Sequence, residues 1–248
     1  MGDHFGLTGL ISSRRRARAE CRLREAVEVK QLDFFYFFGS GYSYLSVMRI
    51  GAMAKQSGVA VRWRPFNVRT VMAENNIALR TQTAKVKYMW RDVERRAATH
   101  GVPYVRPPTW PTDPNLLANR TAMVAAEEGW CEAYTVASFR AWYLEGMALG
   151  DRGHLEHVLP PLGQDVDDVI AKADQPSAHE RLEAETDAAR NYGIFGAPAF
   201  VVEGETFWGD DRLEEALAWA VGRHKLQTSP YYPAVWRDEQ PDRPRAKS

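Results

Sequence analysis

The pattern of apolar and polar positions begins with a strand, a helix and a second strand. A nearly continuous apolar run, rich in aromatic residues, covers 32–38 and ends at glycine, which predicts a buried strand. Apolar residues then recur at helical spacing over 44–56, and Gly58 follows as a stop signal. Residues 59–66 alternate between apolar and polar side chains, which predicts a second strand. Because the three elements are joined so closely, we expect a βαβ unit with parallel strands.

The pattern near the other end of the chain predicts two strands and a helix. Residues 199–202 form a short apolar strand, Glu203-Gly204 is a turn signal, and 206–208 returns as the second strand of a hairpin. A helix should open at Asp211, an acidic N-cap in a capping-box pattern. Its apolar face comprises Leu213, Ala216, Leu217, Ala220 and Val221.

The long middle of the chain has helical spacing and almost no strand signal. A proline-rich loop over 103–114 interrupts it. Helices are predicted over 83–99, 115–131, 134–149, 166–173 and 179–191. A βαβ half followed by a ββα half is the arrangement of the thioredoxin fold. We therefore predict an α/β protein with a thioredoxin-like fold and a large all-helical insertion between its two halves.

These patterns predict five parts along the chain. Both ends are rich in charge, and the last segment is also rich in proline, so neither is expected to join the core. The predicted parts are a disordered N-terminal extension 1–31, a βαβ half 32–74, a helical insert 75–192, a ββα half 193–225 and an extended tail 226–248.

Composition narrows the function. The 248 residues carry a formal net charge of zero, which argues against a nucleic acid or an acidic membrane as a partner bound through bulk charge. The two cysteines form no CxxC motif, and the six histidines are scattered, so we expect neither a dithiol centre nor a metal site. No apolar run is long enough to span a membrane, and the N-terminal arginines follow an apolar patch, the reverse of a signal peptide. We expect a cytoplasmic protein.

One serine stands where a thioredoxin-like fold carries its chemistry. Ser40 lies between two glycines, at the start of the first helix, where backbone N–H groups and the helix dipole favour an anion such as a thiolate. Lowering a thiol pKa from about 8.5 by two units requires about 2.7 kcal/mol. A hydroxyl donor to a charged group contributes about 1.5–3 kcal/mol, and a helix terminus adds to it. The alternative is that Ser40 is only a helix N-cap.

A proline near the other end of the chain completes such a site. Ala197-Pro198 comes just before a predicted strand and is a candidate for a cis peptide bond. In that position the backbone of Ala197 can pair with an extended peptide ligand.

Three segments together resemble one family. The stretches "FFYFFGSGYSYL", "RPFNV" and "GIFGAPAFVVEGETFWGDDRLEEAL" are similar to those of the 2-hydroxychromene-2-carboxylate isomerase family, which belongs with kappa-class glutathione transferases and DsbA-like proteins. The resemblance implies that Ser40 hydrogen-bonds the sulfur of a glutathione cofactor. It further implies glutathione contacts by Ala197-Pro198 and by Gly209, Asp210 and Asp211. The family usually has proline after the serine, where this chain has Gly41.

The substrate is less well defined by the sequence. The resemblance implies cis–trans isomerisation of a small conjugated aromatic keto-acid by a homodimer. Asn67, Asn76 and Lys85 are candidates for substrate contact. Loop capping explains Asn67 equally well, and a solvated helix face is the default interpretation of Asn76 and Lys85. Tyr42, Trp90, Tyr104 and Trp110 can stack on an aromatic ring or simply pack in the core.

Two other functions remain open on the sequence alone. A kappa-like glutathione transferase or peroxidase would use the same thiol site but would consume glutathione. A non-catalytic thioredoxin-like binding protein would hold a peptide or thiol beside Pro198 without turnover.

Overall fold

The computed structural model describes residues 30–77, 83–107 and 109–228. The predicted extension over 1–31 falls almost wholly outside the described residues. The predicted tail over 226–248 does so from 229 onward, while its first residues belong to helix α11, Lys225–Thr228.

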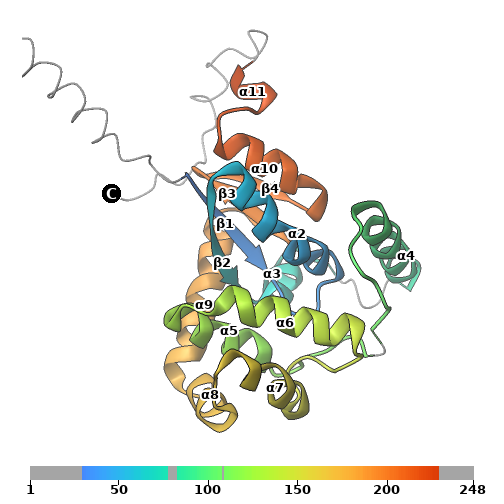
Figure 1. Cartoon of the computed structure of the whole chain (residues 1–248). Helices are drawn as coiled ribbons and strands as arrows, with labels where there is room; N and C mark the ends of the chain where they lie inside the picture. Colours follow the sequence, from blue (N-terminus) through green and yellow to red (C-terminus); the bar gives the residue numbers. More distant parts are fainter. Residues whose placement is uncertain (1–29, 78–82, 108, 229–248) are drawn as a thin grey trace, which may run out of the picture. The chain divides into compact units, whose positions relative to one another are not determined.

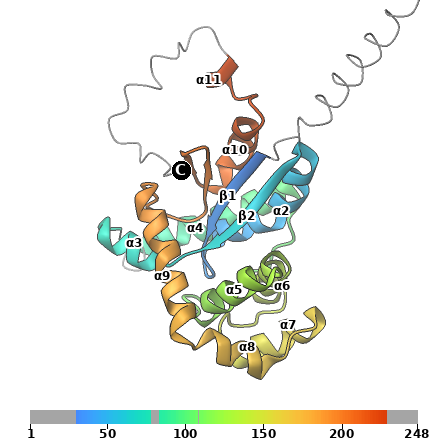
Figure 2. The same ribbon diagram turned by 90° about the vertical axis from the view of Figure 1, so that its left-hand side faces the viewer.

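A four-stranded sheet forms the centre of the fold. Its strand order is β2-β1-β3-β4, with β1 covering Lys30–Tyr36, β2 Val59–Pro65, β3 Ala199–Val202 and β4 Glu205–Trp208. β1 and β2 run in the same direction, as their arrows show in Figures 1 and 2. β3 pairs antiparallel with both β1 and β4. The predicted βαβ and ββα halves are therefore present and share one mixed sheet.

The first strand ends two residues earlier than the apolar pattern predicts. Phe37 and Phe38 are buried, but they follow the end of β1. The N–H of Phe37 donates to the hydroxyl of Ser43 at 3.4 Å, and that of Phe38 donates to the side-chain oxygen of Asn119 at 3.5 Å. Side chains take the place of a neighbouring strand here, which a hydrophobic pattern alone does not reveal.

Helices occupy the chain between β2 and β3. Helix α2, Gly41–Ser57, connects the first two strands. The insertion comprises α3 (Val68–Glu74), α4 (Thr83–His100), α5 (Leu117–Glu128), α6 (Cys131–Leu144), α7 (Arg152–Val158), η2 (Pro160–Leu162), α8 (Val166–Ala173) and α9 (Pro176–Asn191). In both views α5 to α8 gather beyond the end toward which β1 points (Figures 1 and 2). This is a thioredoxin-like fold with a large helical insertion.

Two helical predictions need correction. α3 and α7 have only seven residues each, too short for a periodic pattern to predict, and both were missed. The predicted N-cap role of Asp211 is wrong, because a 3₁₀ turn, η3 over Asp210–Arg212, precedes the last long helix. That helix, α10, spans Leu213–Ala220, and its N-cap Arg212 makes no side-chain capping bond.

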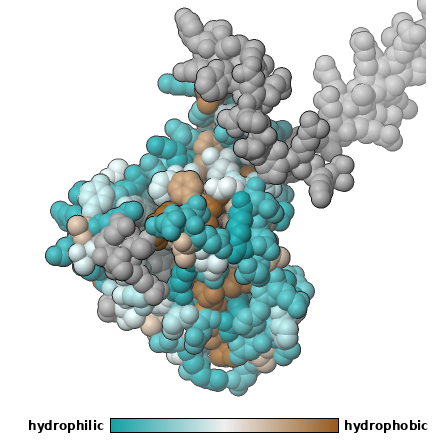
Figure 3. All heavy atoms as spheres, turned by 180° about the vertical axis from the view of Figure 1, so that it is seen from behind, coloured by the Kyte–Doolittle hydropathy of each residue, from teal (hydrophilic) through white to brown (hydrophobic). Residues whose placement is uncertain are grey.

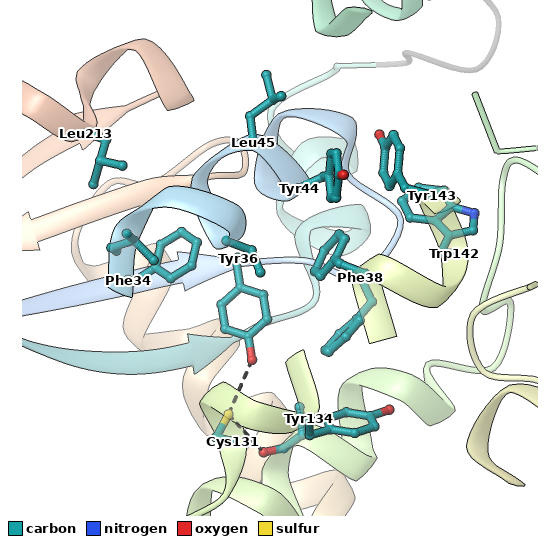
Figure 4. Close-up of a cluster of buried hydrophobic side chains, with 14 of the residues drawn as sticks. Phe34, Tyr36, Phe38, Tyr44, Leu45, Cys131, Tyr134, Trp142, Tyr143 and Leu213 are labelled. Atoms are coloured by element: carbon teal, nitrogen blue, oxygen red, sulfur yellow. Dashed lines mark hydrogen bonds between the residues drawn. The ribbon is translucent and has the colours of Figure 1, made fainter. Parts of the chain in front are cut away.

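The side chains of β1 alternate between two cores, as strand geometry requires. Phe34 and Tyr36 pack on one side with residues of α2, α6 and α10, whereas Phe35 packs on the other side with α3 and α9. The first core is strongly aromatic, and Figure 4 shows Phe38, Tyr44 and Tyr143 close together within it. The rings of Tyr44 and Tyr143 stack with centroids 3.7 Å apart.

The face seen in Figure 3 is mainly hydrophilic. Seen from behind, apolar atoms show along the middle of the face and polar side chains flank them (Figure 3). Across the described residues, no helix is both long and apolar enough to cross a membrane.

Candidate functional site

The loop between β1 and α2 presents the serine at a helix N-terminus. Gly39 has a φ of 100°, a conformation that a side chain would disfavour, and it lets the chain turn directly into α2. Ser40 is the N-cap of α2, with φ −91° and ψ 120°. Its hydroxyl accepts a hydrogen bond from the N–H of Ser43 at 3.1 Å. The capping role considered from the sequence is thus present, and one lone pair of the hydroxyl remains free.

The structure brings Ser40 against the segment near Pro198. The Ser40 hydroxyl donates to the carbonyl oxygen of Ala197 at 3.1 Å, across 157 residues of sequence. The Ala197–Pro198 peptide bond is cis, which confirms the prediction. Both groups are partly exposed, so a ligand can reach the hydroxyl proton and the carbonyl.

The space beside Gly41 is filled by neighbouring side chains. A Cβ at Gly41 would lie 3.0 Å from the hydroxyl oxygen of Tyr143 and 3.1 Å from Cγ2 of Val93. Both distances are tighter than ordinary van der Waals contact. The glycine that departs from the family's usual proline is therefore matched by local packing, in which α4 and α6 close against the start of α2.

Two tryptophans flank the serine loop. The indole N–H of Trp110 donates to the carbonyl oxygen of Gly39 at 3.0 Å. On the other side of Ser40, Trp90 lies 3.8 Å from the position of a Cβ at Gly41. The two indoles meet edge to face, with centroids 5.8 Å apart and an interplanar angle of 89°.

A hollow lies between helix α4, which carries Trp90, and the proline loop, which carries Trp110. It has a volume of about 460 Å³, within the range of small-molecule sites. We call it the tryptophan hollow, and it is lined by Val86, Trp90, Arg106, Pro107 and Trp110. The guanidinium of Arg106 lies over the ring of Trp90, 5.4 Å from its centroid. The hollow thus combines aromatic walls with one cation.

A separate ion-pair cluster holds the segment after β4. The carboxylate of Asp210 is only 1% exposed. It accepts bonds from Arg96 at 2.8 Å and from Arg49 at 3.3 Å, and Arg49 also contacts Glu214 at 2.6 Å. Burial raises the pKa of Asp210, and the two guanidinium groups oppose that shift. The cluster ties α2 and α4 to the start of α10.

The tyrosines around the serine loop remain protonated at neutral pH. Burial raises the pKa of Tyr143 well above its usual value. Burial, together with a 3.0 Å bond to Asp92, also raises the pKa of Tyr42. Burial likewise raises the pKa of Tyr104. None of these phenols is suited to act as a base at neutral pH.

Residues 31–219 match the DSBA-like thioredoxin domain. The chain belongs to the DSBA-like thioredoxin family. This match spans the sheet and the whole helical insertion.

Three sequence relatives and one solved structure have the same name. The chain is 28% identical, over 75% of its length and 95% of the relative, to a 2-hydroxychromene-2-carboxylate isomerase of Sphingobium xenophagum. It is 29% identical, over 77% of its length and 94% of the relative, to one of Pseudomonas putida. A solved structure of a 2-hydroxychromene-2-carboxylate isomerase superposes with a TM-score of 0.70 at 27% identity, covering 81% of this chain and 98% of that one.

Not all residues predicted for the site of this DSBA-like domain meet at Ser40. Gly209 donates its N–H to the carbonyl oxygen of Pro198 at 2.9 Å, so its backbone adjoins the cis-proline. Asp211 is exposed on the η3 turn, whereas the carboxylate of Asp210 is buried in the ion-pair cluster. The side chain of Asp210 is thus engaged within the protein and is not presented to a ligand.

The three predicted substrate residues lie apart from the tryptophan hollow. Asn67 is the N-cap of α3, accepting from the N–H of Arg69 at 3.2 Å. It lines a different hollow, beside α9. Asn76 is exposed after α3 with a φ of 58°, and Lys85 is exposed on α4. For Asn67 the capping alternative is the one that the structure shows.

Sequence reasoning missed several residues that position the serine loop. Asn119 binds the backbone of Phe38, and its side-chain N–H donates to the buried Asp113 at 2.9 Å. Arg106 was not recognised at all, because it stands between prolines in a loop without periodicity. No signal along the sequence links these positions to Ser40. Within the described residues, no group of three or more metal-binding side chains occurs.

Proposed function

We propose that this protein is a glutathione-dependent cis–trans isomerase of a conjugated aromatic keto-acid, of the 2-hydroxychromene-2-carboxylate type. The observation that carries the proposal is the placement of Ser40. A hydroxyl occupies the helix N-terminus, beside the cis-proline, in a loop that contains no cysteine. Such a site can stabilise a thiolate but has no thiol of its own, and three curated relatives bear the isomerase name.

The residues present fit a cysteinyl thiol. The hydroxyl of Ser40 already accepts from Ser43, so its proton is available to turn from the carbonyl of Ala197 toward a sulfur. That rotation would leave the carbonyl of Ala197 free to accept an N–H from the ligand backbone. The donor bond of Ser40 and the dipole of α2 together are sufficient for the two-unit pKa shift that the chemistry requires.

Glutathione, when bound, supplies a thiol that adds reversibly to the conjugated double bond, so that the bond can rotate and the thiol can leave unconsumed. The protein contributes the hydroxyl of Ser40, the N-terminus of α2 and the backbone of Ala197. In this proposal Gly209 and Asp211 are the remaining candidates for the γ-glutamyl end. Because free thiols persist in a reducing compartment, we place the protein in the cytoplasm. A homodimer is part of the same expectation, and the native mass in solution tests it.

The test is turnover of 2-hydroxychromene-2-carboxylate with and without glutathione. We expect isomerisation that requires glutathione and returns all of it. Ser40→Ala should cut turnover at least tenfold, whereas Ser57→Ala, at the exposed far end of α2, should leave it unchanged. Accumulation of a glutathione conjugate would indicate a kappa-like transferase instead. Glutathione binding without turnover would indicate a binding protein.

A further inference from the structure

We infer that the tryptophan hollow holds the aromatic rings of the substrate and that Arg106 holds its carboxylate. This inference rests on the proposed function, since it assigns a site to that substrate. It makes Arg106 a specificity-determining residue in a position that the sequence pattern gives no reason to select.

The hollow is linked to the serine loop through its two tryptophans. Trp110 contacts Gly39 through a 3.0 Å hydrogen bond, and Trp90 approaches Gly41 to 3.8 Å of its Cβ position. These two glycines are the residues on either side of Ser40. A ligand seated in the hollow therefore lies against the same two tryptophans that contact the serine loop.

The walls suit a flat conjugated ligand. The indole rings in its lining offer flat apolar surface on which a planar ring system can stack. Val86 and Pro107 complete the apolar lining. A volume of about 460 Å³ is in the range found for pockets that bind small molecules.

The cation at the rim is available for a carboxylate. The other arginines near this part of α4 are already paired: Arg91 with Glu94 at 2.6 Å, Arg95 with Asp92 at 3.0 Å and Arg96 with Asp210 at 2.8 Å. Arg106 is exposed and, within the described part of the chain, contacts no carboxylate. Its guanidinium is permanently charged and binds a carboxylate through two parallel hydrogen bonds.

Lys85 is the natural competitor for the same role. It lies one residue before Val86, yet it does not line the hollow. An ammonium group also lacks the planar pair of donors that matches a carboxylate. We therefore expect replacement of Arg106 to weaken carboxylate binding more than replacement of Lys85.

The experiment measures binding of chromone-2-carboxylate, an unreactive bicyclic carboxylate, to the full chain by calorimetry without glutathione. The uncharged chromone-2-carboxamide is the paired ligand. We expect Arg106→Gln to weaken binding of the carboxylate at least tenfold and to leave binding of the carboxamide unchanged. Trp110→Leu should weaken both ligands. The matched control is Arg91→Gln, an exposed α4 arginine paired with Glu94, which should change neither.

Three results would overturn the inference. In the first, the unaltered protein does not bind the carboxylate at millimolar concentration. In the second, Arg106→Gln weakens binding of both ligands equally. In the third, Lys85→Gln weakens carboxylate binding more than Arg106→Gln does. The circular dichroism spectrum and thermal midpoint of each variant exclude unfolding as the cause of a loss.

The same measurements separate this inference from the proposed function. If Arg106 governs carboxylate binding but the protein never isomerises 2-hydroxychromene-2-carboxylate, the anion site stands and the isomerase proposal falls. If turnover with glutathione is normal but Arg106→Gln affects neither binding nor KM, the isomerase proposal stands and the assignment of Arg106 falls.

Discussion

The serine loop and the segment after β4 both carry part of the family resemblance but differ in what they expose. Ser40 keeps a partly exposed hydroxyl whose proton rests on the neighbouring carbonyl of Ala197. Asp210 has its carboxylate buried and held by Arg49 and Arg96. One polar group is free to exchange its partner for a ligand, whereas the other fixes the fold. Exposure leaves the Ser40 hydroxyl able to meet a ligand, whereas burial gives the Asp210 carboxylate a structural role.

The largest expected change in the free energy of unfolding comes from replacing Asp210. Replacing Asp210 by Asn leaves two guanidinium groups with less compensation, and breaking a buried pair in this way costs about 3–5 kcal/mol. The matched control is Asp211→Asn, whose exposed side chain should change the unfolding free energy by less than about 0.5 kcal/mol. Urea unfolding measures both. Equal stability of the two variants would mean that Asp210 is not structural.

A buried polar group without such partners should respond to pH. Burial lowers the pKa of His154 from 6.5 to about 4 in the fold, so the unfolded chain binds a proton first as pH falls. The free energy of unfolding is therefore unaffected by His154 above pH 6.5. It falls between pH 6.5 and 4, by up to about 3 kcal/mol. Unfolding free energies at several pH values, compared with His154→Leu, isolate the effect. Identical slopes for the two proteins would contradict it.

A smaller effect is expected at Gly41. Gly41→Ala places a methyl group against the hydroxyl of Tyr143 and should cost about 1–3 kcal/mol. Tyr143→Phe removes that oxygen, which has no hydrogen-bond partner among the described residues, and should recover part of the loss. Unfolding of the two single variants and the double variant gives the coupling energy. Additive effects would show that this contact does not explain the glycine.

The smallest effect on stability is expected at Ser40 itself. Ser40→Ala removes an N-cap and should cost about 1 kcal/mol, whereas Ser40→Gly should cost only a few tenths. Thermal unfolding compares the two with the unaltered chain. If Ser40→Gly lowered the free energy of unfolding by several kcal/mol, the main role of Ser40 would be structural, like that of Asp210.

The sequence allowed the elements around Ser40 to be predicted because their signals are local. The apolar run before Gly39, the helical spacing after Ser40 and the hairpin turn at Glu203-Gly204 are each contained in a few residues. The cis bond before Pro198 was predicted from the place of Ala197-Pro198 just before a strand, and it is present.

What could not be predicted depends on contacts between distant parts of the chain. The burial of Asp210 is set by Arg49 and Arg96, which are 161 and 114 residues away in sequence. Arg106 lies over Trp90 because the proline loop folds against α4, and no periodicity in the sequence indicates this contact. Side-chain pairing over such distances leaves no local pattern, so the role of each residue emerged only from its neighbours in space.

The central claim is that the hydroxyl of Ser40 stabilises a thiolate, and titration of glutathione bound to the protein tests it most directly. Ultraviolet difference absorbance of the thiolate should show an apparent pKa about two units below the 8.5 of a free thiol. In Ser40→Gly, which keeps the helix cap nearly intact, that pKa should return upward by at least one unit. An unshifted thiol pKa in the unaltered protein, or the same lowered value in both proteins, would contradict the account.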